Sequence, residues 1–139
     1  MKITIGTINV RRGLGNRTLI MDLYAWVDVF FILKPPVKRS GGFMEHEREE
    51  FKLFSFVKGS GVEVFVRMGI VGLMSMVRHD EISAVMEFMD GGGCRREFGG
   101  EYLSPEKGMG VAVEWLERLK SCNVLVGDFN VRHRVWGEK

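Results

Sequence analysis

Short apolar segments of strand length alternate along the chain with polar and glycine-rich stretches. Residues 2–9 are predicted to be a first strand, with Ile3, Ile5 and Thr7 on one face. Residues 27–33, apolar except at Asp28, are predicted to be a second strand that is buried on both faces. Residues 18–26 between them are predicted to be a helix, with Asn16 as a candidate N-cap. The apolar residues of this helix recur at helical spacing: Leu19, Leu23 and Trp26. A strand, a helix and a strand in this order predict a crossover that places the two strands close together.

In the middle of the chain, apolar segments bounded by turn residues predict five further strands, at residues 51–57, 62–68, 70–77, 82–89 and 94–103. Residues 58–61 (Lys-Gly-Ser-Gly) have the composition of a hairpin turn between the first two of these strands. Residues 82–89 fit both helical and alternating patterns, and the glycine triplet 91–93 favours a strand in a second hairpin. Residues 38–50, which include a charged run, are expected to be a loop.

The C-terminal part of the chain predicts one helix and one strand. Ser104 is a natural cap and Pro105 suits the first helical position, so a helix is expected over residues 106–120. Residues 123–127 (Asn-Val-Leu-Val-Gly) form a last apolar strand. A chain of 139 residues can bury one modest core, and its elements predict a single α+β domain over residues 1–139.

The amino-acid composition and the net charge exclude few classes of function. The net charge of 20 − 18 = +2 permits a nucleic-acid partner, although dedicated binders usually concentrate basic charge more strongly. The two cysteines, Cys94 and Cys122, have no histidine at ligand spacing, which gives a zinc site little support. No apolar run approaches the roughly 18 residues that span a bilayer, and the N-terminus has no signal-peptide pattern. We therefore expect an intracellular, cytoplasmic protein with no membrane partner.

Polar residues directly after buried strands are the first candidates for chemistry, because the strand fixes their position while their side chains face a crevice. The first predicted strand ends at Asn9, and the last is followed by Asp128 and Asn130. A spacing of two in extended backbone points the last two side chains to the same face. A carboxylate beside two carboxamides could hold a water or a divalent ion and orient a phosphate oxygen. The alternative is that these are ordinary turn residues.

The longer string around these residues, 124–137 (VLVGDFNVRHRVWG), carries more information. An apolar strand runs into Gly-Asp-Phe-Asn, with His133 three residues and Trp136-Gly137 six residues after Asn130. This string closely resembles the signature of the endonuclease/exonuclease/phosphatase superfamily, and most of all that of the apurinic-type endonuclease domain of non-LTR retrotransposons. The resemblance implies a DNase-I-like two-sheet α/β sandwich, of which this chain would be the β-rich N-terminal half, with two or three flanking helices.

Three other segments are similar to family motifs and occur in the family's order. Residues 8–10 (Ile-Asn-Val) resemble the first-strand motif, residues 27–32 resemble the second strand, and residues 101–105 (Glu-Tyr-Leu-Ser-Pro) resemble a strand whose Tyr lies by the scissile phosphate. The resemblance implies hydrolysis of phosphate esters.

The same resemblance implies roles for individual residues. Asp128 would orient or activate the attacking water, Asn9 and Asn130 would position phosphate or metal, and Tyr102 would support the phosphate. His133 receives no catalytic part and is expected to support its neighbours.

The first departure from the family concerns the metal. The family's second strand runs into Gln-Glu, whose Glu is a metal ligand, but the corresponding pair here is Leu33-Lys34. An ammonium group at that place repels Mg²⁺. Binding of Mg²⁺ or Mn²⁺ is therefore expected to be weakened, and the metal ligands stay unassigned. Either Lys34 contacts phosphate directly in place of the metal, or the site is inactive, or this segment is aligned out of register.

The second departure is length. Family members are considerably longer and carry, in their second half, a Ser-Asp-His segment whose His contacts the phosphate. Residues 78–80 (Arg-His-Asp) contain similar residue types but lie in the wrong part of the chain, so they are interpreted as a loop. A sandwich cut in half would expose one apolar sheet face, and a homodimer would bury it.

Five arginines follow the two strand ends: Arg11, Arg12, Arg17, Arg132 and Arg134. If the first and last strands are neighbours, these arginines form a basic rim that suits a nucleic-acid backbone, which Lys34 would also contact. The alternative is a solvated edge.

Two hypotheses follow from the sequence. The first is a metal-dependent nuclease or phosphodiesterase-like protein of the endonuclease/exonuclease/phosphatase type with reduced activity. The alternative is a catalytically inactive nucleic-acid-binding or scaffold protein with the same fold, as a monomer or a homodimer. DNA, RNA and a small phosphate ester all stay open as the ligand.

Overall fold

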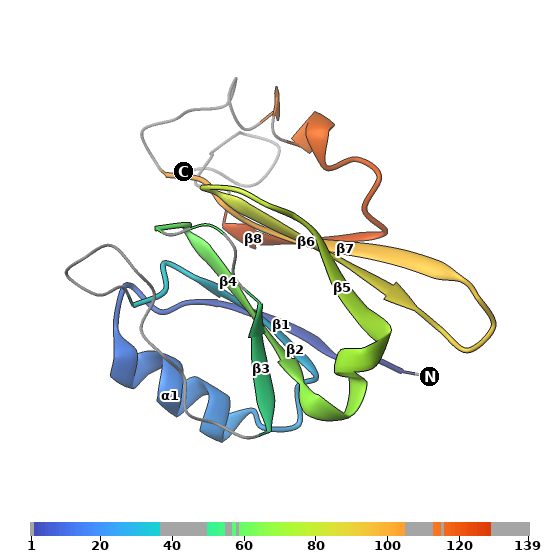
Figure 1. Cartoon of the computed structure of the whole chain (residues 1–139). Helices are drawn as coiled ribbons and strands as arrows, with labels where there is room; N and C mark the ends of the chain where they lie inside the picture. Colours follow the sequence, from blue (N-terminus) through green and yellow to red (C-terminus); the bar gives the residue numbers. More distant parts are fainter. Residues whose placement is uncertain are drawn as a thin grey trace, which may run out of the picture.

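A computed structural model describes residues 2–36, 50–54, 57, 59–104, 113–114 and 116–128. These residues form two four-stranded sheets (Figure 1). The first sheet, in the order β1-β2-β4-β3, contains β1 (Ile5–Asn9), β2 (Val29–Leu33), β3 (Phe51–Phe54) and β4 (Val62–Arg67). The second, in the order β5-β6-β7-β8, contains β5 (Met74–His79), β6 (Ser83–Met89), β7 (Arg95–Tyr102) and β8 (Val124–Asp128). Helix α1 (Leu14–Leu23) connects β1 to β2, and the 3-10 helix η1 (Met68–Leu73) precedes β5.

The strand pattern predicted from the sequence is confirmed, with shorter strands than expected. All five residues of β2 are buried, as its unbroken apolar run predicts. β1 and β2 pair in parallel across α1, which confirms the crossover. β3 pairs antiparallel with β4, and β6 pairs antiparallel with β7, which confirms both hairpins. The observed class is a β-rich mixture of helix and strand, in agreement with α+β.

Four predicted segments differ from the structure or lie, wholly or in part, outside the described residues. The strand expected over residues 70–77 is wrong in its first part, because η1 occupies residues up to Leu73 and β5 begins at Met74. The interpretation of residues 78–80 as a loop is also wrong, since Arg78 and His79 end β5. The loop expected over residues 38–50 falls almost wholly outside the described residues. Of the helix expected over residues 106–120, only 113, 114 and 116–118 are described as helical.

The core lies between the two sheets. Side chains from both sheets are buried there together: Val29, Phe31, Val64, Met86, Phe88 and Phe98. The rings of Phe31 and Phe98 meet edge to face across the sheets, with centroids 6.1 Å apart. The expectation that a half-length chain leaves one sheet face exposed is therefore wrong, because each sheet covers the inner face of the other.

Helix α1 packs on the outer face of the first sheet, through Met21 against Phe30 and Phe65 (Figure 1). It begins at Leu14, so the predicted cap Asn16 lies inside it, and Gly13 is at the N-cap position. Because α1 ends at Leu23, the helix predicted over residues 18–26 is confirmed only over residues 18–23, and its predicted apolar face is not the buried one. The apolar residues that defined this face are exposed by 55%, 62% and 65%: Leu19, Leu23 and Trp26.

Neither cysteine forms a disulfide: Cys94 and Cys122 are both free thiols. In the described part of the chain, no helix combines the length and the apolarity that a membrane span requires.

Candidate functional site

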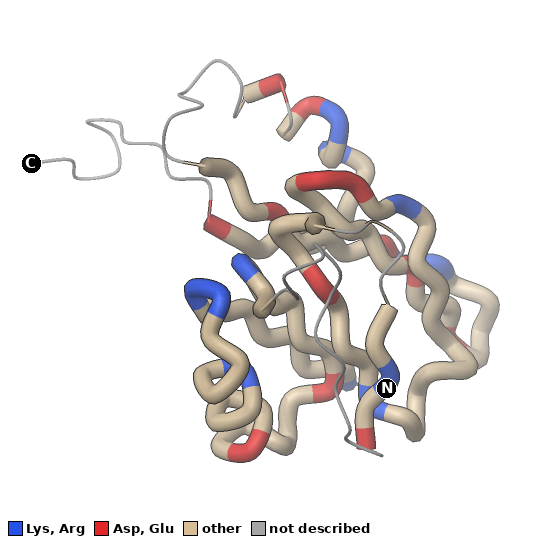
Figure 2. The backbone as a smooth tube through the Cα atoms, turned by 60° about the vertical axis from the view of Figure 1, so that its left-hand side comes forward, with Lys and Arg blue, Asp and Glu red and all other residues tan. Residues whose placement is uncertain are grey.

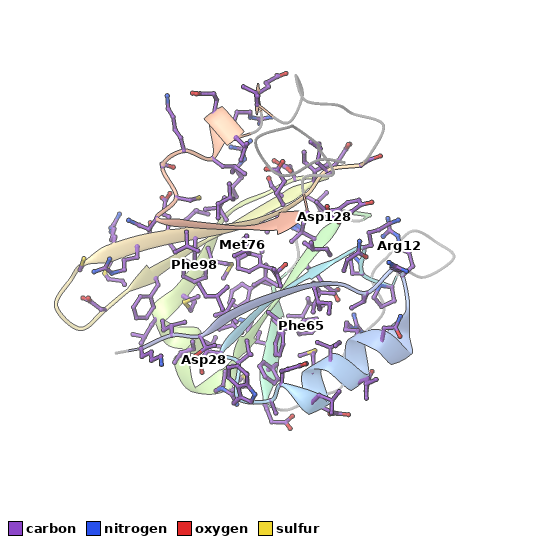
Figure 3. The ribbon with its side chains drawn as sticks, turned by 180° about the vertical axis from the view of Figure 1, so that it is seen from behind. Arg12, Asp28, Phe65, Met76, Phe98 and Asp128 are labelled. Atoms are coloured by element: carbon purple, nitrogen blue, oxygen red, sulfur yellow. The ribbon has the colours of Figure 1, made fainter. Side chains whose placement is uncertain are left out.

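The carboxyl ends of four strands meet at one end of the sandwich. β1 and β2 are parallel and end at Asn9 and Leu33, while β7 and β8 are parallel and end at Tyr102 and Asp128. Tyr102 and Asp128 are register partners at the end of their two strands. Figure 3 shows Arg12, in the loop after β1, on the same side of the molecule as Asp128. The fold thus brings together residues from four distant places in the sequence.

Lys34 connects the ends of the two sheets. Its Nζ lies 5.5 Å from the centroid of the Tyr102 ring, which is a cation–π arrangement. Its backbone N–H donates to the Gly61 carbonyl at 2.9 Å, and the Gly61 N–H donates to the Glu81 carbonyl at 2.7 Å. Lys34 also has a positive φ of 48°, an uncommon conformation for a residue with a side chain. Backbone hydrogen bonds therefore hold Lys34 in this conformation beside the second sheet.

Two arginines lie beside Lys34 in the loop after β1. Arg11 and Arg12 have positive φ values of 51° and 64° and are exposed. The Arg12 N–H donates to the Lys34 carbonyl at 2.7 Å, and Arg12 Nη1 donates to the Pro35 carbonyl at 3.1 Å. Figure 2 shows two basic segments of the backbone tube close together, just above the coiled helix at the left of the view. We call Arg11, Arg12 and Lys34 the cationic rim.

Asn9 and Asp128 lie at the strand ends as the sequence predicts. The Asn9 Oδ1 accepts a hydrogen bond from the Arg11 N–H at 2.9 Å, so the carboxamide orients the arginine loop. The Asp128 carbonyl accepts from the Leu103 N–H at 2.8 Å, and the residue is half-buried. Four other predicted site residues lie outside the described residues: Asn130, Arg132, His133 and Arg134.

Arg17 is not part of the rim, which corrects the sequence-based expectation. Its side chain is fully buried, and its Nη1 donates to Glu63 Oε1 of β4 at 2.8 Å. The guanidinium also lies over the Phe65 ring, 5.3 Å from its centroid. Burial raises the pKa of the Glu63 carboxyl to about 7, although the nearby Arg17 charge works in the opposite direction. This ion pair attaches the first turns of α1 to the first sheet.

His79 and Asp80 lie at the same end of the sandwich, which sequence reasoning missed because it treated them as a loop. His79 Nδ1 accepts from the Val57 N–H at 3.2 Å, so Nε2 carries the proton and donates to the Val62 carbonyl at 2.9 Å. Burial lowers the pKa of His79. Asp80 Oδ1 accepts from both the N–H and the hydroxyl of Ser83 at 2.8 Å. These contacts connect strand ends and turns, so they give His79 and Asp80 structural roles.

Glu101 is a second buried carboxyl that the sequence did not single out. It precedes Tyr102 in β7 and therefore points to the opposite face of the strand. The side chain is fully buried, and among the described residues neither carboxylate oxygen has a hydrogen-bond partner. Burial raises the pKa of Glu101 to about 7, with a further increase from Asp80 and a smaller opposing effect of Arg78. In the sequence, only the alternation of side chains along a strand indicates that Glu101 points to the face opposite Tyr102.

The described residues do not fit a tight magnesium site. Among them, no group of three or more His, Cys, Asp or Glu side chains could hold a metal ion. Lys34, rather than a carboxylate, stands beside Tyr102, and Mg²⁺ needs several oxygen ligands in octahedral geometry.

Comparison with known proteins adds no assignment: neither a family model nor a curated protein matches the sequence.

Proposed function

We propose that the chain is a nuclease- or phosphodiesterase-like protein of the endonuclease/exonuclease/phosphatase type, with a DNase-I-like fold, that binds a phosphodiester at the strand ends and cleaves it slowly. The observation that carries this proposal is the position of Lys34 Nζ over the ring of Tyr102, the register partner of Asp128. It supports the proposal because a cation held at the end of the strand that pairs with the Asp128 strand can bind a phosphate oxygen, and a carboxylate at the same strand ends can orient water.

Each residue at the strand ends has a distinct part in this proposal. The cationic rim (Arg11, Arg12 and Lys34) binds phosphate oxygens, and Asn9 holds the arginine loop in place. Asp128 accepts a proton from the attacking water while the water oxygen bonds to phosphorus and the bond from phosphorus to the ester oxygen breaks. The leaving oxygen takes a proton from the solvent. Tyr102 supports the phosphate next to Lys34.

A specific observation favours the alternative, a nucleic-acid-binding protein without catalysis. By the resemblance, Lys34 takes the position of the family's metal-binding Glu, and among the described residues no group of three or more His, Cys, Asp or Glu side chains could hold a metal ion. A rim of three cations binds a phosphate backbone even when no cleavage follows. The two functions share the binding step and differ only in the role of Asp128.

The binding step is tested with a short fluorescent duplex DNA and fluorescence anisotropy over a range of salt concentrations. We expect Lys34→Ala and Arg12→Ala each to weaken binding about tenfold and to reduce the salt slope by about 1. Arg95→Ala is the matched control, because Arg95 is exposed by 67% and begins β7, at the opposite end from Tyr102. Equal losses in all three variants would show that binding is non-specific and would contradict the proposal.

The cleavage step is tested with supercoiled DNA in Mg²⁺ and in Mn²⁺. Asp128→Asn removes the carboxylate with little change in size, so it should abolish nicking and leave binding intact. Lys34→Glu should raise metal-dependent nicking, because it restores a carboxylate beside Tyr102. Binding by the wild type without nicking in either metal would establish the alternative.

A further inference from the structure

β1 is an edge strand with open backbone groups. In its parallel pairing with β2, the Thr4 carbonyl and the Val10 N–H both bond to residues of β2. Backbone direction alternates along a strand, so the N–H and carbonyl groups of the odd residues Ile5, Thr7 and Asn9 point away from β2. Among the described residues, no strand pairs with this edge. Such an edge is a template for another strand.

A groove of about 360 Å³ runs along the same edge, between β1 and the end of α1. Its β1 side consists of five consecutive residues, 4–8, and its helix side includes Ile20, Tyr24 and Trp26. The Trp26 side chain is exposed by 65% and Tyr24 by 45%, and their rings meet edge to face at 6.2 Å. Figure 3 shows β1 at the front of the molecule with α1 beside it. None of the residues that line the groove carries a charge.

An open strand edge beside a helix, with an apolar groove between them, is the geometry in which proteins bind extended peptides by strand addition. The edge supplies backbone hydrogen bonds, and the groove accepts alternate side chains of the added strand. We propose that this groove binds an extended, apolar segment of another protein as an additional strand beside β1, with acidic residues at both ends of the segment. This inference rests on the open edge and the groove and not on phosphodiester cleavage, although Arg11 and Arg12 belong both to the cationic rim and to one end of β1.

The acidic ends of the partner follow from the charges that flank β1. Exposed Lys2 precedes the strand, and exposed Arg11 and Arg12 follow it. The uncharged groove therefore lies between cations at both ends, which complement an apolar peptide with acidic flanks. A strand as long as β1 pairs with about five to seven residues of such a peptide.

The same charges disfavour a second copy of this chain as the occupant. Two β1 strands related by a two-fold axis must run antiparallel. A pairing centred on Thr7 places Lys2 of one copy opposite Arg12 of the other, at both ends of the added strand. Like charges directly opposite each other destabilise strand pairing.

The test uses the whole chain and a synthetic peptide of alternating Val and Thr with two Glu residues at each end. In amide hydrogen exchange by NMR, the peptide should slow exchange at Ile5, Thr7 and Asn9, and leave Gly6 and Ile8, which already pair with β2, unchanged. A peptide with Lys in place of each Glu should bind about tenfold more weakly.

Variants at Thr7 and at Trp26 measure separately how much the strand edge and the groove contribute to peptide binding. Thr7→Pro removes an outward N–H at an edge position that tolerates proline, and Thr7→Val keeps it, so only the first should lose peptide binding. Trp26→Ala, at a side chain exposed enough to leave the fold intact, should weaken binding about tenfold. Unchanged exchange at Thr7 with the peptide, or wild-type affinity in Trp26→Ala, would overturn the proposal. So would sedimentation showing a dimer in which the Thr7 amide is already protected, since a second copy would then occupy the edge.

Discussion

The Arg17–Glu63 ion pair is the clearest case in which a single residue connects two elements of this molecule. Both side chains are fully buried, and the pair joins α1 to β4. Arg17→Met should lower the free energy of unfolding by about 3–5 kcal/mol, because it leaves the Glu63 carboxyl buried without its partner. Urea denaturation followed by circular dichroism measures this change.

Two further variants control this measurement. The double variant Arg17→Met, Glu63→Leu should recover most of the lost stability, since it removes both members of the pair and leaves neither charge buried alone. Lys120→Ala breaks an exposed pair with Glu117 and should change stability by less than about 1 kcal/mol. A small loss in Arg17→Met alone would show that the buried pair does not hold α1 in place.

Single residues were the least predictable level of this structure. The sequence predicts an exposed Arg17, because a charged side chain is rarely buried without a partner. The partner, Glu63, is distant in sequence and could not be identified from it. The strand-end positions of Asn9 and Asp128 could be predicted, because each follows a strong strand pattern. The cation–π contact of Lys34 with Tyr102 could not, because it depends on the packing of two sheets.

At the level of elements, apolar strands were predictable and the orientation of the helix was not. The run in β2 is apolar at every position because both of its faces are covered. In α1, the buried face contains Arg17 and Met21. Because the buried face includes a charged residue, it shows no continuous apolar stripe in the sequence. The exposed side of α1 carries apolar residues at helical spacing and was therefore predicted to be the buried face.

The contact between the two sheets leads to a prediction at β7. Gly100 lies where an added Cβ would collide with the Phe31 ring of the first sheet. Gly100→Ala should therefore lower stability by about 1–3 kcal/mol, since the sheets must separate or Phe31 must change its rotamer. The thermal unfolding temperature measures the effect. Gly72→Ala is the matched control, because a Cβ there meets no atom within 4 Å, and a loss as large as that of Gly100→Ala would contradict this account.

At the scale of the whole molecule, the candidate site depends on topology. The parallel pairs β1–β2 and β7–β8 end at the same end of the sandwich, and the sheet contact brings these two ends together. The sequence predicted the first pair from a crossover pattern, but the parallel pairing of β7 with β8 spans a segment that is only partly described. Asn9, Tyr102 and Asp128 each end a strand, and the resemblance to a nuclease signature, which gives them a common site, stays a prediction.

Global stability should depend on pH through Glu101, whose two carboxylate oxygens lack partners in the described part of the chain. Its pKa is raised from 4.5 to about 7, so the unfolded chain releases this proton at lower pH than the folded one. The contribution of Glu101 to the free energy of unfolding is fully present below pH 4.5 and is lost as the pH rises through about 7. Glu101→Gln removes the charge, so the free energy of unfolding of this variant relative to wild type should increase between pH 5 and pH 8, by at most about 3 kcal/mol.

Urea unfolding of both proteins across this pH range measures the difference. The exposed variant Glu117→Gln is the control and should show no such trend. A gain that stays constant with pH would mean that Glu101 is ionised in the folded protein and has a partner that neutralises it.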